Sequence, residues 1–289
     1  MKMGLVGLGR MGAGIAERLR RAGHEVVGYD RDPTVSQVAT LAELVDRLEP
    51  PRIVWLMVPA GEPTQAVIDT LAGILTSGDI MIEGGNSYYK DSIRRAKEVE
   101  ARGISFVDCG TSGGIWGLSG GFCLMAGGPR AAFDRIEPLL TALAPENGYA
   151  YLGPSGAGHY AKMVHNGIEY GLLQAYAEGF HLLEASDFDY DLEAVSLLWN
   201  NGSVIRSWLL ELARDAFGRD PKLAQLRGYV DDSGEGRWTV QEAVERAVAA
   251  PVITQALFSR FLSRDDNVFA DRFIAALRNE FGGHAVRES

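Results

Sequence analysis

Short apolar segments alternate with amphipathic segments over the first half of the chain. Residues 2–6 read as a strand, residues 11–21 as a helix with one apolar face, and residues 25–29 as a second strand. The alternation continues with strands at residues 52–58, 79–83, 105–108, 122–126 and 150–152, and with helices at 62–75, 90–101 and 130–143. Strands that alternate with helices predict an α/β domain with a mostly parallel sheet.

The pattern becomes helical after the turn sequence Gly153-Pro154-Ser155-Gly156. No strong helix breaker occurs between residues 157 and 186, and about 30 helical residues would form a rod of roughly 45 Å. Further helices are expected at 192–200, 203–217, 239–249, 252–262 and 267–281. We therefore expect an α/β domain at residues 1–154 and an all-α domain at residues 155–289, built on a long central helix.

A glycine-rich turn joins the first strand to the first helix. Its sequence, Gly7-Leu8-Gly9-Arg10-Met11-Gly12, is a GxGxxG motif. The first glycine allows the tight turn, the second lets the backbone approach a pyrophosphate, and the third lets the helix pack closely on the strand. A lone GxGxxG is a weak signal, but here it stands between a strand and a helix. The context predicts a Rossmann-type dinucleotide-binding domain.

An acidic residue ends the second strand, 23 positions after Gly7. The Asp30 carboxylate should accept hydrogen bonds from the ribose hydroxyls and repel a 2′-phosphate, which favours NAD. Arg31 follows and could accept a phosphate, so NADP is possible. Val58 and Pro59 end the third strand and should also contact the cofactor, because ligands bind beyond the carboxyl ends of parallel strands.

Five polar residues share one stripe of the long predicted helix: Lys162, His165, Asn166, Glu169 and Tyr170. The offsets of +3, +4, +7 and +8 from the lysine match one helical face. An amine, an imidazole, an amide, a carboxylic acid and a phenol together can move protons and orient a hydroxylated acid. The alternative is a solvated polar face. The apolar flanks at 161, 163, 164, 168, 172 and 173 favour a buried helix instead.

Two glycine-containing loops, at residues 83–87 and 108–114, follow predicted strands. Backbone N–H groups of Gly113 and Gly114, with the Ser112 hydroxyl, could form a cradle for a carboxylate. Asn86 lies in the other loop, within reach of the same edge of the sheet. The alternative is ordinary turn chemistry, since Asn, Ser and Gly are the residues that turns favour.

Composition narrows the class of partner. Lysine plus arginine number 28 and aspartate plus glutamate 38, so the formal charge of −10 disfavours a nucleic-acid partner. The two cysteines fit neither a disulfide framework nor a zinc site. The apolar run at residues 53–60 is too short to span a bilayer. We expect a soluble cytoplasmic protein that needs no metal.

These motifs together resemble the 6-phosphogluconate dehydrogenases (decarboxylating), within the wider β-hydroxyacid dehydrogenase group. The resemblance runs from about residue 3 to residue 284. The wider group shares the glycine turn, Thr111-Ser-Gly-Gly114 and the lysine, whereas the phosphogluconate branch is marked by the longer segment around it. The branch-specific segments are Lys162-Met-Val-His-Asn-Gly-Ile-Glu-Tyr170, Trp199-Asn-Asn-Gly-Ser-Val-Ile-Arg-Ser207 and Arg278-Asn-Glu-Phe-Gly-Gly-His284.

The chain departs from the family pattern in three respects. It is much shorter than the long-form enzymes and lacks their duplicated helical region, so it resembles a short form. The segment 233–239 resembles a loop that carries a lysine and a threonine for the substrate phosphate, but Ser233 and Glu235 stand at those places. Arg260 and Arg278 would then hold more of the phosphate charge.

The resemblance implies NAD-dependent oxidative decarboxylation of 6-phosphogluconate to ribulose 5-phosphate. Lys162 would act as general base and Glu169 as the acid that protonates C1. His165, Asn166 and Asn86 would orient hydroxyls, and Asn86 could also meet the nicotinamide. Ser112, Gly113 and Gly114 would hold the carboxylate, and Tyr170, Arg260, Arg278 and His284 the phosphate.

The resemblance also implies a homodimer or homotetramer, in which the C-terminal tail with Arg278 and His284 completes a neighbour's site. Two other hypotheses stay open from the sequence. One is a β-hydroxyacid dehydrogenase that acts on a non-phosphorylated or related sugar acid, which Glu169 and the arginines disfavour but which Ser233 and Glu235 leave open. The other is a non-catalytic nucleotide-sensing protein, which the Lys162–Glu169 pair disfavours.

Overall fold

The computed structural model describes residues 1–265 and 268–282. Two compact units divide the chain, Met1–His165 and the remainder from Asn166 on. The division falls inside helix α7 (Ala157–Glu184), because the first turns of α7 pack on the sheet of the N-terminal unit. The expected domain boundary after residue 154, which follows the change from strands to helices, stays a prediction.

The described residues of the N-terminal unit form a seven-stranded sheet with the strand order β2-β1-β3-β4-β5-β6-β7. Every neighbouring pair is parallel except β5–β6, which confirms the mostly parallel sheet that the alternation predicts. The strands are β1 (Lys2–Val6), β2 (Glu25–Tyr29), β3 (Ile53–Leu56), β4 (Ile80–Glu83), β5 (Ser105–Ser112), β6 (Cys123–Gly127) and β7 (Tyr149–Gly153).

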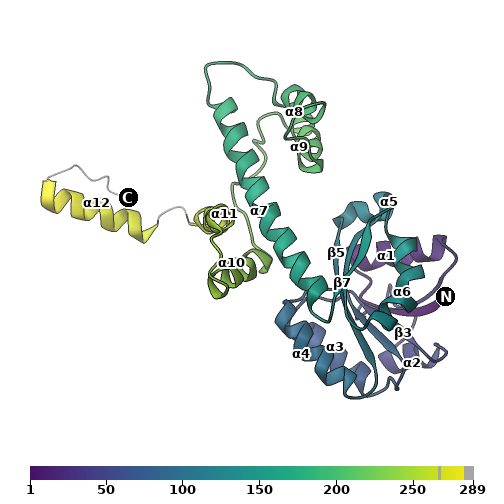
Figure 1. Ribbon diagram of the computed structural model, residues 1–289. Coiled ribbons are helices and arrows are strands. Elements are labelled where there is room, and N and C mark those ends of the chain that lie inside the picture. Colours follow the sequence, from purple (N-terminus) through teal and green to yellow (C-terminus); the bar gives the residue numbers. More distant parts are fainter. Residues whose placement is uncertain (266–267, 283–289) are drawn as a thin grey trace. The chain divides into compact units, whose positions relative to one another are not determined.

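Helices cover both faces of this sheet (Figure 1). Helices α1 (Arg10–Arg21) and α6 (Arg130–Leu143) pack on the face that receives Ile53 and Trp55 of β3. Helices α2 (Leu41–Asp46), α3 (Glu62–Ala72) and α4 (Tyr89–Glu100) lie on the opposite face, where Val54 and Leu56 point. Successive side chains of a strand alternate between faces, so one buried strand contributes to two apolar cores.

The structure contains three helical elements that the periodicity did not predict. The first is α2, and its signal was present in the sequence: Thr40 caps the helix by accepting from Glu43 N, while Ala39 N donates to the Glu43 carboxylate. The others are the 3-10 turn η1 (Gly114–Trp116) and the single turn α5 (Gly117–Gly120), which are too short to produce a hydrophobic period.

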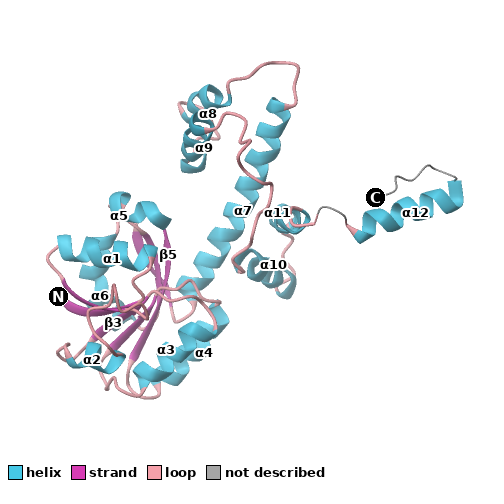
Figure 2. Cartoon of the chain, turned by 180° about the vertical axis from the view of Figure 1, so that it is seen from behind, coloured by secondary structure: helices cyan, strands magenta, loops and turns pink. Residues whose placement is uncertain are grey.

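The second unit is built of helices and loops (Figure 2). After α7 come α8 (Leu192–Asn200), α9 (Trp208–Arg219), α10 (Glu235–Glu245), α11 (Pro251–Leu262) and α12 (Phe269–Gly282). Two small apolar clusters lie along α7. Around Tyr170, α7 packs with α10 and α11, and around Phe180 it packs with α8 and α9. These clusters confirm an all-helical part built on a long helix.

The expected burial of α7 is only partly observed. Met163 is buried, whereas Ile168 (52% exposed), Leu172 (46%) and Leu173 (37%) lie open in the single chain. The expectation from the apolar flanks is therefore wrong for these three residues. Exposed apolar side chains on a helix that also carries polar groups mark a surface suited to a protein contact.

The loop before α10 is tied to the end of α11 by a buried carboxylate. The Asp232 side chain is 4% exposed and accepts from Arg237 Nε at 2.6 Å and from Arg264 Nη2 at 2.6 Å. The hydrogen bond from Arg237, together with Arg264 and against the effect of burial, holds the pKa of Asp232 below its ordinary value of 3.8. The second unit thus gains acid-sensitive stability at this point.

We predict that Asp232→Asn lowers the free energy of unfolding by about 1–2 kcal/mol at pH 7, since a charge-assisted bond pair is lost and both arginines are partly solvated. A carboxylate with a depressed pKa stabilises the fold above its unfolded pKa and loses that contribution as pH falls through the folded pKa. The difference between variant and wild type should therefore shrink below about pH 4. Urea unfolding followed by circular dichroism at pH 7 and at pH 3 measures this difference in stability.

The exposed neighbour provides the control, since Asp231→Asn should leave the unfolding curve nearly unchanged at either pH. An equal loss of stability for Asp232→Asn at pH 7 and at pH 3 would contradict the ionic origin of the effect.

Candidate active site

The glycine turn after β1 has the geometry that its sequence pattern requires. Gly7 has a φ of 93°, and a Cβ at Gly12 would lie 2.0 Å from Gly7 O, so neither position accepts a side chain. Gly9 has open space where its Cβ would be, and no side chain among the described residues caps the start of α1. The helix N-terminus is therefore open to an anion, as a bound pyrophosphate requires.

Asp30 lies at the end of β2 beside this turn. Its Oδ2 accepts from Leu8 N at 2.6 Å and its Oδ1 from Asp32 N at 3.0 Å, so the carboxylate is fixed against the glycine turn. A fixed negative charge there suits ribose hydroxyls and repels a 2′-phosphate. Arg10 and Arg31, the nearest predicted basic residues, are exposed, while Leu8 and Met11 are half-buried. The donor and acceptor set fits NAD.

The loops after β3 and β4 approach each other closely. Val58 and Pro59 follow β3, and a Cβ at Gly85 would lie 2.4 Å from Val58 O. Asn86 takes a left-handed conformation with a φ of 55°, and its amide group donates to Thr111 O at 3.0 Å and accepts from Thr111 N at 2.8 Å. The structure thus joins these predicted cofactor residues to the end of β5.

The first turns of α7 lie directly on the backbone of the sheet. A Cβ at Gly158 would lie 2.2 Å from Met125 O, and a Cβ at Gly110 of β5 would lie 2.5 Å from Lys162 Cβ. Asp108, also in β5, accepts from Gly156 N at 2.6 Å and from His159 N at 2.8 Å. Burial raises the pKa of this carboxyl. Glycine contacts and a buried cap therefore fix the position of Lys162.

The predicted carboxylate cradle begins inside a strand rather than in a loop. β5 extends to Ser112, so Thr111 and Ser112 pair with β6 instead of forming a turn. Gly113 and Gly114 follow with positive φ values of 116° and 53°, and η1 begins there. The cradle residues and Lys162 belong to the same unit: the cradle lies at the end of β5, and Lys162 of α7 packs against Gly110 of the same strand.

The polar stripe is divided between the two compact units. Lys162 (5% exposed) and the half-buried His165 belong to the first unit, and Asn166 (9%), the half-buried Glu169 and Tyr170 (3%) belong to the second. A surface amine at a helical position is normally solvated, so a lysine that is 95% covered is the least expected member of the set.

Tyr170 and Arg260 form one cluster in the second unit. The Tyr170 ring lies against Gly236, where a Cβ would be 2.3 Å from the ring, and the Arg260 guanidinium stacks 3.4 Å from its centroid. The Tyr170 hydroxyl accepts from Ser233 N at 3.3 Å, and Arg260 Nη1 donates to Asp231 O at 2.9 Å. The structure therefore brings together two of the four predicted phosphate-binding residues.

The other two predicted phosphate residues belong to the C-terminal tail. Arg278 is an exposed residue of α12, and His284 lies outside the described residues. The start of α10 adds an acid beside Tyr170, because Glu235 is buried and its carboxylate accepts from the Ser233 hydroxyl. Ser233 and Glu235, the two residues that depart from the family pattern, thus lie beside Tyr170.

Sequence reasoning did not assign the residues that hold Lys162 in place. Gly110 looked like a generic loop glycine and Asp108 like the end of a strand, because a pattern does not show which backbone segments lie in contact. It also missed the buried Arg95, which is indistinguishable in sequence from its exposed neighbour Arg94.

Comparisons with known proteins identify the family. Residues 2–153 match the model of the NAD binding domain of 6-phosphogluconate dehydrogenase, and residues 158–279 match its C-terminal domain. The chain belongs to the 6-phosphogluconate dehydrogenase family. A Bacillus subtilis protein assigned to this dehydrogenase is 47% identical over the full length of both chains. A Haloferax volcanii 6-phosphogluconate dehydrogenase, NAD(+)-dependent and decarboxylating, is 46% identical over 99% of this chain and 98% of its own.

A solved 6-phosphogluconate dehydrogenase from Plasmodium falciparum has a TM-score of 0.82 and 27% identity. It covers all of this chain, but the match spans only 66% of that protein. The chain is therefore a short form of the 6-phosphogluconate dehydrogenases, as its length relative to the family predicts. Among the described residues, none of the helices combines the length and apolar character needed to cross a membrane.

We predict that Gly110→Ala lowers kcat of this 6-phosphogluconate dehydrogenase about 10- to 100-fold. The added methyl group would lie 2.5 Å from Lys162 Cβ and 3.0 Å from Gly158 O, so the helix turn that carries the amine must move. A displacement of about 1 Å costs on the order of 10²-fold in rate. Steady-state kinetics below the melting temperature measures the effect.

The matched control is Gly179→Ala in the same helix, where the added Cβ meets nothing within 4 Å. It should keep wild-type kcat and raise the stability slightly, because alanine favours helices over glycine by about 1 kcal/mol. A wild-type kcat for Gly110→Ala would show that the close contact between Gly110 and Lys162 is not needed for turnover.

Proposed function

We propose that the protein catalyses NAD-dependent oxidative decarboxylation of 6-phosphogluconate to ribulose 5-phosphate and CO₂. The observation that carries the proposal is Lys162, a lysine that is only 5% exposed and packs on β5 in the unit that also holds the glycine turn and Asp30. A buried amine close to the end of a strand that is followed by a glycine turn can serve as a general base. The full-length similarity to the NAD(+)-dependent Haloferax volcanii relative supports the same activity.

NAD is the proposed cofactor, and NADP is the second choice. When bound, NAD supplies the acceptor for the hydride from C3 of the substrate. The Gly7–Gly12 turn would hold the pyrophosphate, and Asp30 the ribose hydroxyls. Arg31, exposed next to Asp30, is the residue that could accept a 2′-phosphate.

Two residues of α7 carry the proposed proton transfers. Lys162 takes the proton of the C3 hydroxyl as the hydride leaves, which produces a 3-keto acid. CO₂ leaves because the keto group accepts the electron pair, and the protonated lysine hydrogen-bonds to that oxygen. Glu169 then protonates C1 of the enediol. Seven residues correspond to about 10 Å of helical rise, which suits two different carbons of one extended substrate.

Further residues orient the substrate. Ser112, Gly113 and Gly114 hold the carboxylate, and His165, Asn166 and Asn86 orient hydroxyls. Tyr170 and Arg260 bind the phosphate, with Arg278 and His284 of the C-terminal tail. The stacked guanidinium and ring present a charged, pre-oriented surface for such a group.

We further propose that the active form is a homodimer or homotetramer in which the tail completes a neighbour's site. Support comes from the apolar side chains that α7 and later helices leave open, among them Ile168, Val244, Phe273 and Leu277. Arg278, an exposed residue of α12, could then contact the phosphate of a substrate bound in a neighbouring subunit. A cytoplasmic location stays a prediction from composition.

One observation favours a second candidate activity. Glu235 is 6% exposed and begins α10, directly after the loop whose Ser233 N donates to Tyr170, where a phosphate-binding site gains from positive charge. A related sugar acid without phosphate would avoid repulsion from this carboxylate. This candidate predicts the same use of Lys162 but no preference for the phosphorylated acid.

A substrate panel with NAD tests the proposal. We expect NADH and CO₂ in equal amounts from 6-phosphogluconate, with a higher kcat/KM than for gluconate or simple 3-hydroxy acids. Lys162→Met should lose more than about 10³-fold in kcat while NAD binding is kept, since general-base removal typically costs 10² to 10⁴. NADH without CO₂, or equal use of gluconate, would refute the phosphogluconate assignment.

Arg278→Ala should raise KM for 6-phosphogluconate at least tenfold and change KM for gluconate little, because the guanidinium is proposed to contact only the phosphate. Arg272→Ala, an exposed arginine of the same helix, is the control. Mixing Arg278→Ala with Lys162→Met subunits should restore part of the activity if the arginine acts across a subunit interface. No recovery in a confirmed mixed oligomer would place Arg278 in its own subunit's site or outside it.

A further inference from the structure

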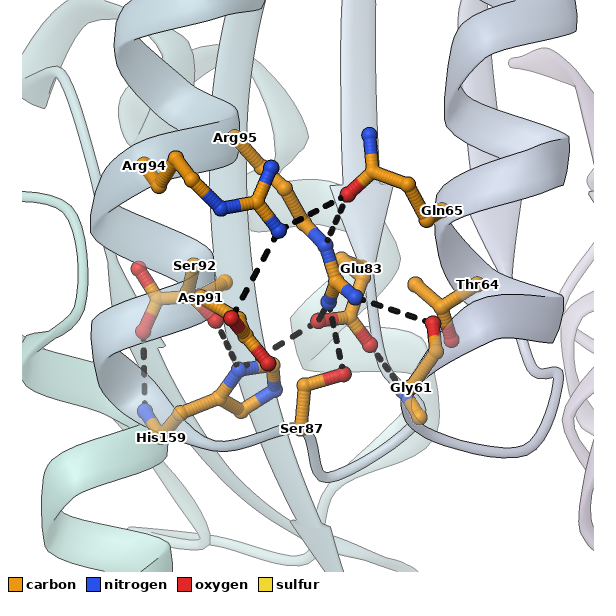
Figure 3. Close-up of polar contacts among 12 residues, drawn as sticks. Gly61, Thr64, Gln65, Glu83, Ser87, Asp91, Ser92, Arg94, Arg95 and His159 are labelled. Atoms are coloured by element: carbon orange, nitrogen blue, oxygen red, sulfur yellow. Dashed lines mark hydrogen bonds and ion pairs between the residues drawn. The ribbon is translucent and has the colours of Figure 1, made fainter.

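A buried guanidinium links loops at the carboxyl ends of two strands. Arg95 of α4 is 1% exposed, and each of its three nitrogens donates a hydrogen bond. Nε donates to Gln65 Oε1 at 3.0 Å, Nη1 to Ser87 Oγ at 3.0 Å and Nη2 to Gly61 O at 3.1 Å (Figure 3). Gly61 lies in the loop after β3, and Ser87 in the loop after β4.

A carboxylate extends this cluster to helix α7. Glu83 ends β4, and its Oε1 accepts from Gly85 N at 2.8 Å. Its Oε2 lies 3.6 Å from Arg95 Nη1 and 3.4 Å from His159 Nδ1, and His159 Nδ1 is also 2.7 Å from Ser92 Oγ (Figure 3). The Glu83 and His159 side chains are fully buried. The buried network of Glu83, Arg95 and His159 thus joins β4, α4 and α7.

Stability alone does not account for this network. Replacing a buried ion pair with apolar residues is often neutral or stabilising, because both charges lose their hydration. Burial lowers the pKa of Arg95, which reflects that cost. Glu83 Oε2 and His159 Nε2 are also buried without a hydrogen-bond partner among the described residues. Each such atom adds a further cost in a folded protein.

The network instead contacts the neighbours of three proposed functional segments. Through Gly61 it holds the loop that contains Val58 and Pro59. Through Gly85 and Ser87 it holds both sides of Asn86. Through His159 it reaches α7, three residues or about one helical turn before Lys162. All of these residues belong to the N-terminal unit.

We propose that the Glu83–Arg95–His159 network positions the cofactor loops and Lys162 relative to one another, so that the rate of hydride transfer depends on Arg95. The proposal rests on the proposed function, because it assigns the network to that reaction. Arg95 acts as a positioning residue, with no contact to the reacting atoms required. Its planar fork suits the role, since it fixes three acceptors in a defined geometry that a lysine amine cannot reproduce.

The effect should appear in the chemical step. Reacting groups held in near-attack geometry gain several kcal/mol of barrier reduction, and small displacements lose much of it. If the loops and the helix turn separate slightly, hydride transfer from C3 slows while each ligand still finds most of its contacts. Loss of a purely structural contact would lower the melting temperature and leave the turnover of folded protein unchanged.

Arg95→Lys is the main test, because it keeps the positive charge and removes the fork. We expect kcat to fall about 10- to 100-fold, with both KM values within about threefold of wild type. With 6-phosphogluconate deuterated at C3, the isotope effect on kcat should be at least as large as in wild type, because hydride transfer then limits the rate. The control, Arg94→Lys, changes the exposed neighbour and should retain wild-type kinetics.

Gln65→Met is the second variant, in case Arg95→Lys does not fold. It removes only the acceptor of Arg95 Nε, apart from contacts with exposed Arg94 and Asp69, and should lower kcat in the same direction by a smaller factor. Unchanged kcat in folded variants, or an isotope effect that falls towards one, would overturn the positioning role. A wild-type protein that does not oxidise 6-phosphogluconate would instead refute the proposed function, and this inference with it.

Discussion

The close contact between α7 and the end of β5 is the constraint on which the proposed site depends. Helix and strand approach until Gly158 meets the carbonyls of β5 and β6 and Gly110 meets Lys162 Cβ, which is possible only where both elements lack side chains. The same contact lets Asp108 cap the helix from within the sheet. A long side chain that would ordinarily reach solvent is thereby covered and held at a fixed height above the strand. Lys162 is thus positioned by backbone packing, which is stiffer than a side-chain contact.

The buried charges extend this constraint to the cofactor side. The contact between α7 and β5 fixes Lys162, the proposed base. Hydride transfer also requires that the loops proposed to contact the cofactor are held in a fixed position relative to this lysine. Arg95 and Glu83 connect the loops after β3 and β4 to His159, one turn before Lys162. An apolar core could pack these segments equally tightly, but it would not define hydrogen-bond distances between backbone groups of separate loops. The free-energy cost of burying these charges is therefore understandable, because their hydrogen bonds fix the distances between the loops.

The sequence predicted the parts of this structure that depend on local pattern. Strand and helix alternation, the glycine turn and Asp30 follow from periodicity and spacing, and the α/β fold and the family are confirmed. The roles of the individual site residues stay predictions. What the pattern could not show is contact between distant segments: β5 runs on to Ser112, Gly110 lies against Lys162, and Arg95 is buried while Arg94 is not. The predicted burial of Ile168 and Leu172 was wrong for a related reason. Apolar residues on a helix give the same sequence pattern whether they pack in a core or lie on the surface of the single chain.

The cluster around Tyr170 bears on which acid the enzyme prefers. Arg237 and Arg264 donate to the Asp232 carboxylate, whereas Arg260 donates to the backbone carbonyl of Asp231. Glu235 adds a buried carboxylate, so with the exposed Asp231 the acids of this segment equal the three arginines in number. Asp232 already occupies two of the arginines, which leaves Arg260 as the cation stacked on Tyr170. A dianionic phosphate bound there would need a further cation to balance its charge against Glu235. The tail residues Arg278 and His284 are the proposed source, so under the proposed function the preference for a phosphorylated substrate would depend on assembly of the oligomer.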